Sequence, residues 1–163
     1  MALYPVPEFE RKICARAQLA TWVATLKRPL VFTNGCFDIL HRGHVTYLAQ
    51  ARALGMSLVI GVNSDASIKR LGKGEDRPIN SEADRLAVLA ALEGVSLVTL
   101  FDEATPLQMI LSIRPDILVK GGDWETNAIV GSSEVLLWGG QVHSIPFLHQ
   151  RSTTATLAKI RNL

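Results

Sequence analysis

The chain has 163 residues, of which 48% are hydrophobic and 20% are charged, and its 17 basic and 15 acidic side chains give a formal net charge of +2. This length corresponds to one domain with its own core, and the apolar fraction excludes a disordered chain. The sequence has no apolar run near the roughly 20 residues of a membrane span, no dense basic tract and only two cysteines, so we expect a cytoplasmic protein that binds neither membrane nor nucleic acid.

Helical and β-prone segments alternate along the chain. Hydrophobic spacing and end signals predict, in order, a helix over residues 9–27, a strand over 30–34, a helix over 43–54, a strand over 57–63, a charged mobile loop over 68–80, a helix from 81 to about 93, a strand over 96–101, a helix beginning at 105, a strand over 116–122, a helix near 132–138, a strand over 141–145 and a last helix capped by Ser152 or Thr153.

Capping signals mark two of these helix starts. Ser81 followed by Asp84 is a capping pattern. Thr105, Pro106 and Gln108 combine an N-cap, a proline at the first helical position and a capping box.

Apolar strands separated by helices predict a parallel sheet of about five strands with helices on both faces, that is, a doubly wound α/β fold. Residues 1–28 would form a helical extension that packs on a single domain of residues 29–163.

Polar residues collect directly after four of the predicted strands. They form the segments Thr33–His44, Asn63–Asp65, Lys120–Trp124 and Gln150–Thr154. Ligands of such folds bind outside the carboxyl ends of the strands, so all four segments are expected at one edge of the sheet. This convergence predicts an active site there.

His41 and His44 are spaced to share one face at a helix start, where backbone N–H groups and the helix dipole favour anions. Gly43 between them removes a side chain where phosphates could approach the backbone. The alternatives are a pair of exposed histidines at a helix cap, or a zinc site with Cys36. Zinc is disfavoured because no further cluster completes four ligands.

Several cations are candidates for phosphate binding. Lys120 ends an apolar strand beside two glycines, whereas the loop cations Lys73 and Arg77 could simply be solvated. Arg85 shares a helical face with apolar residues and so needs an anionic partner, either a phosphate or a structural carboxylate such as Asp38 or Asp65.

The segment from Asn34 to His44, NGCFDILHRGH, resembles the G-x-F-D-x-x-H-x-G-H signature of the cytidylyltransferase-like nucleotidyltransferases, which have a Rossmann-like sheet and a closing S-T-T motif, here at 152–154. Residues 28–162 are similar to the heptose 1-phosphate adenylyltransferases. The motifs that carry this similarity are VNSDAS, the K-G-x-x-R-P loop at 73–78, LVKGGDW and RSTT. Glycerol 3-phosphate cytidylyltransferases carry an arginine before the closing motif, where this chain has Pro146-Phe147-Leu148.

The resemblance implies a role for each matching position. The residues implied in catalysis are His41, His44 and Lys120. Those implied in nucleotide binding are Thr33, Asn34, Gly35, Cys36, Phe37, Gly43, Asp123, Arg151, Ser152, Thr153 and Thr154. Those implied in binding substrate phosphates are Asp38, Asn63, Lys73, Arg77 and Arg85. Cys36 could also be a small apolar filler at the strand–helix junction.

The reaction implied is Mg²⁺-dependent transfer of AMP from ATP to heptose 1-phosphate, giving ADP-heptose for the lipopolysaccharide inner core, by a homo-oligomer with no metal site of its own. The sugar phosphate would attack the α-phosphorus in line, without a covalent enzyme intermediate. The alternatives are a cytidylyltransferase acting on glycerol 3-phosphate or another phosphorylated acceptor, and a non-catalytic nucleotide-sensing domain.

Overall fold

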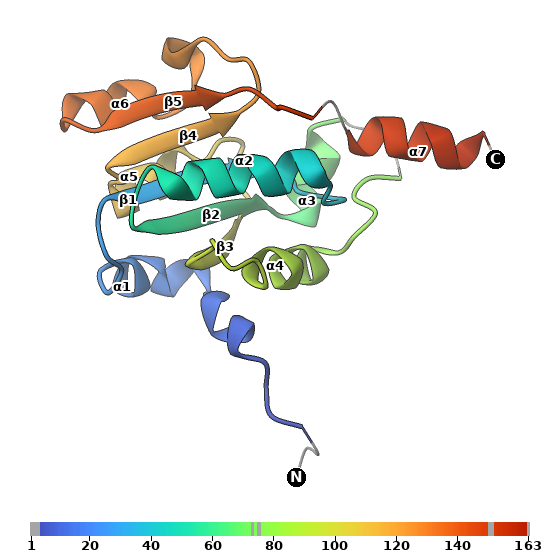
Figure 1. Ribbon diagram of the computed structural model, residues 1–163, viewed down its shortest axis with the longest axis horizontal. Helices are drawn as coiled ribbons and strands as arrows, with labels where there is room; N and C mark the ends of the chain where they lie inside the picture. The colour runs from blue at the N-terminus through green and yellow to red at the C-terminus, as the bar shows by residue number, and fades with distance from the viewer. Residues whose placement is uncertain (1–3, 73, 75, 150–151, 163) are drawn as a thin grey trace.

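The computed structural model describes residues 4–72, 74, 76–149 and 152–162. Its centre is a five-stranded sheet with the strand order β3-β2-β1-β4-β5, and every paired strand runs parallel to its neighbour (Figure 1). The predicted doubly wound α/β fold is therefore confirmed.

The elements follow one another in the order that the alternating sequence pattern predicts. They are η1 (Glu8–Lys12), η2 (Arg16–Gln18), α1 (Leu19–Val23), β1 (Leu30–Gly35), α2 (Arg42–Ala53), β2 (Ser57–Asn63), α3 (Asp65–Arg70), α4 (Glu82–Ala90), β3 (Leu97–Phe101), α5 (Leu107–Ile113), β4 (Ile117–Gly121), η3 (Thr126–Ala128), α6 (Ser132–Leu137), β5 (Gln141–Ile145) and α7 (Thr153–Arg161).

Two apolar layers enclose the sheet because its strands alternate their side chains between the faces. Val31 points into the layer under α2 and α4, whereas its neighbours Leu30 and Phe32 point into the layer under α1, α5 and α6. The helices complete these layers with Tyr47, Leu48 and Ala51 from α2, Leu86 and Leu89 from α4, Leu19 and Val23 from α1, Met109 and Ile110 from α5, and Val135 from α6.

The strand order reverses at β1. The chain winds from β1 to β2 and β3 on one side, then crosses back to place β4 and β5 on the other. Crevices form at such a reversal, beyond the carboxyl ends of the strands. The loops after β1 and β4 are therefore the place to look for a site.

The helix predicted over residues 9–27 is wrong. Only Leu19–Val23 is α-helical, and two 3₁₀ turns precede it. Between those turns Ile13 is extended and forms a parallel bridge with Val98, while the Cys14 backbone N–H donates to the Val98 carbonyl at 3.0 Å. The backbone at Ile13 and Cys14 thus pairs with the outer edge of β3. The hydrogen bonds at this edge outweigh the helix preference that the apolar spacing indicates.

Three smaller predictions also need correction. Residues 68–70 belong to helix α3, which Ser64 caps through its hydroxyl, so the predicted loop starts later. The cap at Thr105 does not form, because α5 begins after Pro106 with no side-chain cap. Helix α4 ends at Ala90, a few residues before the predicted end. The caps at Ser81 and Ser152 are both confirmed, each hydroxyl accepting a backbone N–H three residues later.

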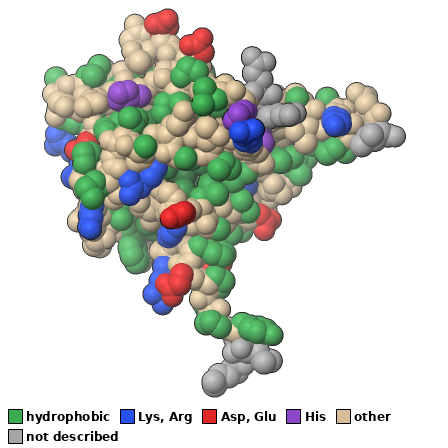
Figure 2. Space-filling view, viewed as in Figure 1, with side chains coloured by type: hydrophobic (Ala, Val, Ile, Leu, Met, Phe, Trp, Pro, Cys, Tyr) green, Lys and Arg blue, Asp and Glu red, His purple; other side chains and the backbone are tan. Residues whose placement is uncertain are grey.

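The last helix is placed differently from the others. Helix α7 projects away from the body of the domain, with hydrophobic side chains visible along it (Figures 1 and 2). Thr153, in its first turn, is its only buried residue. Across the described residues, none of the helices combines the length and apolar character needed to cross a bilayer.

Candidate active site

The loop after β1 makes a tight turn at its carboxyl end. Phe37 has a left-handed backbone with φ of 48°, and its ring is buried. A Cβ at Gly35 would lie only 3.0 Å from this ring, so the glycine lets the ring fold back on the strand. A left-handed conformation in a non-glycine residue costs of order 1–3 kcal/mol, and such strain is concentrated at functional sites.

His41 and His44 stack at the start of α2. Their ring centroids are 3.9 Å apart with an interplanar angle of 21°, and the edge of His44 meets Phe37 at 5.4 Å. His41 is the N-cap residue, so the helix start carries both rings as predicted. Both side chains are half-buried, which disagrees with the alternative of an exposed pair.

The environment of His44 keeps its imidazole neutral. Burial, and then the charge of the adjacent His41, lower the pKa of His44 to about 4, although a hydrogen bond with the Ile39 backbone opposes the shift. Near neutral pH this ring can donate a hydrogen bond to an anion, and an incoming anion would raise its pKa.

Gly43 has a packing reason to be a glycine. A Cβ here would lie 3.0 Å from the His149 carbonyl oxygen and 3.0 Å from two atoms of the His41 ring. The absence of a side chain lets the loop before α7 approach the start of α2, and this approach draws the two polar segments together.

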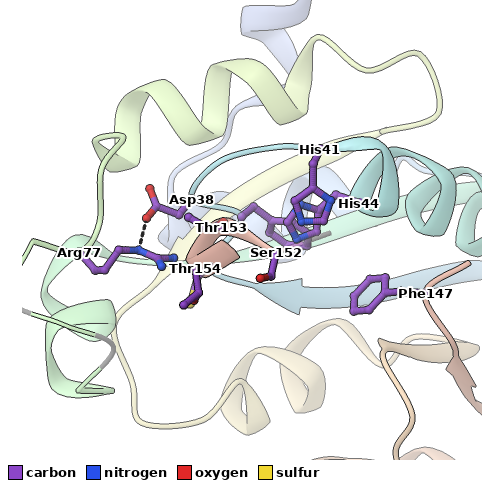
Figure 3. Close-up of a pocket in the computed structure, with 10 residues that line it drawn as sticks. Asp38, His41, His44, Arg77, Phe147, Ser152, Thr153 and Thr154 are labelled. Atoms are coloured by element: carbon purple, nitrogen blue, oxygen red, sulfur yellow. Dashed lines mark hydrogen bonds and ion pairs between the residues drawn. The ribbon is translucent and has the colours of Figure 1, made fainter. Parts of the chain in front are cut away.

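These segments enclose a pocket of about 420 Å³ (Figure 3). Residues from the β1–α2 loop, from the loops before α4 and α7, and from the N-terminus of α7 line it: Cys36, Phe37, Asp38, His41, His44, Arg77, Phe147, Ser152, Thr153 and Thr154. The Ser152 hydroxyl accepts the Ala155 backbone N–H at 3.1 Å and so fixes the start of α7 at the pocket wall. The structure therefore brings the histidine pair and the S-T-T motif into one cavity.

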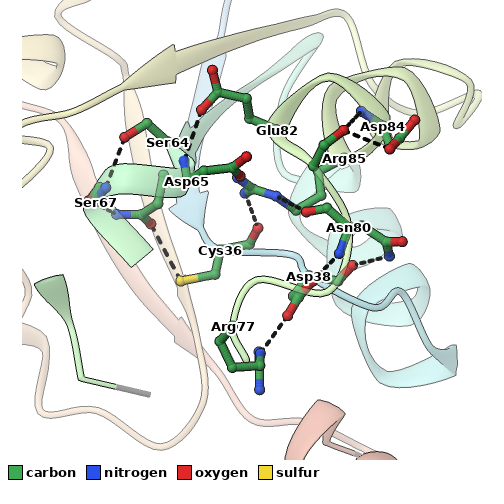
Figure 4. A network of polar contacts seen from close by, with 12 residues as sticks. Cys36, Asp38, Ser64, Asp65, Ser67, Arg77, Asn80, Glu82, Asp84 and Arg85 are labelled. Atoms are coloured by element: carbon green, nitrogen blue, oxygen red, sulfur yellow. Dashed lines mark hydrogen bonds and ion pairs between the residues drawn. The ribbon is translucent and has the colours of Figure 1, made fainter. Parts of the chain in front are cut away.

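Asp38 braces the segment before α4 (Figure 4). Its carboxylate accepts from Arg77 Nε at 2.5 Å and from the backbone N–H groups of Ile79 and Asn80 at 2.8 and 2.9 Å. Burial acts to raise the pKa of Asp38, but the hydrogen bonds from Asn80, Ile79 and Arg77 outweigh it and hold the pKa below its usual range. One carboxylate oxygen thus holds Arg77 and the other holds the two backbone N–H groups, so Asp38 lines the pocket as a brace and its binding of substrate phosphate stays a prediction.

Arg85 is also a structural group. It is 2% exposed, and its guanidinium donates to the carbonyls of Asn80 at 3.2 Å and Cys36 at 2.6 Å and to the Asp65 carboxylate at 2.7 Å (Figure 4). Of the two partners that the sequence left open, the structure provides the carboxylate. Arg85 therefore ties α4 to the β1–α2 loop and does not line the first pocket.

A second pocket of about 350 Å³ lies on the other side of the same loop. Its polar residues are Asn34, Cys36, Asn63, Thr105 and Lys120. Lys120 Nζ donates to Asn34 Oδ1 at 3.5 Å, and Asn63 Nδ2 donates to Ser67 Oγ at 3.0 Å. Lys120 thus lies in a neighbouring pocket rather than beside the histidines, and Cys36 belongs to both pockets.

The remaining residues that the sequence predicts for the site differ in where the structure places them. The Thr33 side chain is fully buried and pairs with the Tyr47 hydroxyl, which leaves its backbone as the group near the site. Asp123 is exposed and lines neither pocket, although the adjacent Trp124 lines the second. Lys73 and Arg151 lie outside the described residues.

Phe147 also lines the first pocket and was not among the residues expected there. No charge or motif marks it. The only available signal was that an apolar ring stands where the glycerol 3-phosphate enzymes have an arginine.

No metal-binding cluster appears among the described residues, where no group of three or more His, Cys, Asp or Glu side chains could hold an ion. The zinc alternative with Cys36, His41 and His44 therefore has no support.

A parallel sheet whose switch-point pocket holds paired histidines and an S-T-T helix start is the architecture of a nucleotidyltransferase. The chain belongs to the cytidylyltransferase-like family, whose model matches residues 32–153. More narrowly, it is 57% identical to the D-beta-D-heptose 1-phosphate adenylyltransferase of Bordetella bronchiseptica, over 94% of this chain and 96% of that protein.

Other relatives agree with this placement. The Bifunctional protein HldE of Magnetococcus marinus is 51% identical over 90% of this chain, which corresponds to 30% of that longer protein. The crystal structure of the lipopolysaccharide core biosynthesis protein from Thermoplasma volcanium matches 75% of this chain and 98% of its own, with a TM-score of 0.61 and 30% identity. Pantoate-beta-alanine ligase from Francisella tularensis, at 12% identity and a TM-score of 0.62 over 93% of this chain and 72% of its own, shares the fold.

Proposed function

We propose that this chain transfers the adenylyl group of ATP to D-glycero-β-D-manno-heptose 1-phosphate, with release of pyrophosphate and formation of ADP-heptose. The observation that carries the proposal is the 57% identity to a heptose 1-phosphate adenylyltransferase over nearly the whole of both chains. The union of the histidine pair and the S-T-T motif in one pocket supports it.

The first pocket suits the triphosphate of the donor. The start of α2 and the start of α7 both face it, and helix N-termini favour anions. His41 and His44 would donate hydrogen bonds to the α-phosphate as negative charge shifts onto the leaving pyrophosphate, and Arg77 would pair with that pyrophosphate. Preorganised donors of this kind contribute roughly 10²–10³-fold each to the rate.

The second pocket suits the phosphate of the acceptor. Lys120 and Asn63 line it, and it adjoins the first pocket at Cys36, which lines both. An acceptor held there would present its phosphate oxygen to the α-phosphorus from the side opposite the leaving group. A new P–O bond then forms as the bond to pyrophosphate breaks, and no enzyme atom becomes covalently attached.

Divalent metal belongs to this reaction as part of the donor. The only carboxylate that lines the first pocket is Asp38 among the described residues, and it already holds Arg77 and two backbone N–H groups. Mg²⁺ would therefore arrive on the phosphates as MgATP, with few protein ligands.

The proposed product would supply assembly of the lipopolysaccharide inner core, and the use of ATP favours a cytoplasmic location. The division into a 1–28 extension and a 29–163 domain stays a prediction, as does a homo-oligomer. Exposed Trp22 on α1 is a candidate contact for a second copy, which sedimentation of the purified protein would test.

The deciding experiment measures pyrophosphate release with Mg²⁺, crossing ATP, CTP and GTP with heptose 1-phosphate and glycerol 3-phosphate. Release only with ATP and the heptose phosphate supports donor and acceptor together. Activity with CTP or with glycerol phosphate would move the chain to a sister activity. Binding of ATP without release under any combination would leave a nucleotide sensor.

A further inference from the structure

Phe147 occupies one end of the first pocket, which lies beside His41 and His44. It follows β5 in the loop that leads to α7, and its ring is 39% exposed. The ring meets His44 edge-on, with centroids 6.2 Å apart at 90°, and Tyr47 at 5.7 Å and 78°. Figure 3 shows it on the opposite side of the histidine pair from Arg77.

The backbone at the end of β4 holds this ring in place. A Cβ at Gly121 would lie 2.9 Å from Phe147 Cζ and 3.0 Å from Tyr47 Cζ, and a Cβ at Gly122 would lie 3.9 Å from Phe147 Cε2. Gly121 therefore provides the bare surface on which the ring rests, whereas Gly122 makes its close approach to Trp124. A ring fixed in this way loses little conformational entropy when a second flat group stacks against it.

The pocket is polarised from end to end. One end presents the start of α7 and the Arg77 guanidinium, whose charge Asp38 partly offsets, whereas the other end presents an aromatic ring. A nucleoside triphosphate has the matching polarity, with a polyanion at one end and a flat aromatic base at the other. Stacking of a base on an aromatic side chain gives affinity without any base-specific hydrogen bond.

We infer that Phe147 is the platform on which the nucleobase of the donor stacks, with the triphosphate running past His41 and His44 toward Arg77. This inference rests on the proposed function and names the specificity element of its donor site. Because a purine offers a larger stacking surface than a pyrimidine, the platform favours ATP over CTP. It also explains the glycine at 121, because a side chain there would displace the ring.

The test compares ATP with inorganic tripolyphosphate, which has the polyanion but no base. In Phe147→Leu we expect the KM for ATP to rise about tenfold and the preference for ATP over CTP to shrink, with kcat changed less than threefold. Inhibition by tripolyphosphate should be unchanged. Phe147→Trp, which keeps an aromatic ring, should have a KM near that of the unaltered protein. Leu148→Ala, at a 66% exposed neighbour outside the pocket, should behave as the unaltered protein.

Two results would overturn the inference. One is an unchanged KM and an unchanged ATP-to-CTP ratio in Phe147→Leu. The other is equal weakening of ATP and tripolyphosphate, which would mean that the ring merely packs the loop. If the unaltered protein releases no pyrophosphate, the proposed reaction fails, but calorimetric titration of both variants with ATP and tripolyphosphate still tests the platform by the same comparison.

Discussion

The two helices whose N-termini line the first pocket, α2 and α7, are anchored very differently. Helix α2 buries Gly43, Tyr47, Leu48 and Ala51 against the sheet, whereas α7 buries only Thr153 in its first turn. A buried leucine alone contributes about 1.5–3 kcal/mol to stability, so α2 is part of the core. Helix α7 is held at its N-terminus by buried Thr153 and at its other end only by an exposed ion pair between Arg161 and Asp76. The fixed wall of the pocket is therefore the start of α2, which carries His41 and His44, and the attached wall is the start of α7, which has little packing behind it.

The largest effect is expected at the fixed wall. His41→Ala and His44→Ala should each lower kcat by about 10²–10³-fold, because each removes a positioned donor to the reacting phosphate. Thermal unfolding should change little, since both rings are only half-buried. Val45→Ala, on the exposed side of the same helix, is the matched control. Near-normal turnover in both histidine variants would remove the proposed mechanism.

The Asp38 carboxylate, which holds Arg77 and the segment before α4, should matter chiefly for folding stability. Asp38→Ala leaves the buried Arg77 guanidinium and two backbone N–H groups without their acceptor, so we expect the free energy of unfolding to fall by about 3–5 kcal/mol. Urea denaturation measures this, with exposed Glu93→Ala as the control. A loss below about 1 kcal/mol would show that the segment before α4 is held by other contacts.

The stacked histidines predict a pH dependence of stability. Folding lowers the pKa of His44 from 6.5 to about 4, so between these values the unfolded chain binds a proton that the folded chain does not. Stability from this group is therefore complete above pH 6.5 and is lost as the pH falls toward 4. The loss amounts to about 1–3 kcal/mol after allowance for solvent screening.

Denaturation curves across this pH range measure the effect, and His44→Ala should flatten the slope. An equal slope in the variant would assign the dependence to other groups.

The smallest effect on stability is expected at the attached wall. Ser152→Ala removes the cap of α7, which contributes about 1 kcal/mol to the helix, yet global unfolding should hardly move because α7 is barely packed. The KM for ATP should rise several-fold. Arg161→Ala, which breaks an exposed ion pair with Asp76 at the far end of α7, is the control and should change neither quantity. A large fall in the unfolding temperature of Ser152→Ala would contradict the contrast between the two walls.

Features that depend on neighbouring residues could be predicted from the sequence, and features that depend on distant contacts could not. The start of α2 and the cap at Ser152 depend on local residues, and both were predictable. For Arg85 the sequence left a phosphate and a carboxylate such as Asp65 as alternatives, because Asp65 lies on another element and only the fold shows that the two meet. Phe147 was missed for a related reason, since an apolar residue in a loop carries no chemical signature until its neighbours are known.

The N-terminal segment failed in a different way. Its apolar spacing fits a helix, but Ile13 instead bridges to Val98 on the outer strand. Local preference is a small term, and a competing set of backbone hydrogen bonds at a sheet edge can exceed it. Helix α3 shows the converse, because its charged residues suggested a loop while the cap at Ser64 supported a helix.

The bridge between Ile13 and Val98 also has a consequence for solubility. An uncovered outer strand presents a row of backbone donors and acceptors that can pair with another molecule. Here the Cys14 backbone N–H donates to the Val98 carbonyl at 3.0 Å, and the Cys14 carbonyl accepts from the Thr99 hydroxyl at 2.9 Å, so the chain covers the middle of this edge itself. The segment around Ile13 and Cys14 therefore shields this part of the β3 edge, and we expect a chain that lacks the segment to self-associate more readily through β3.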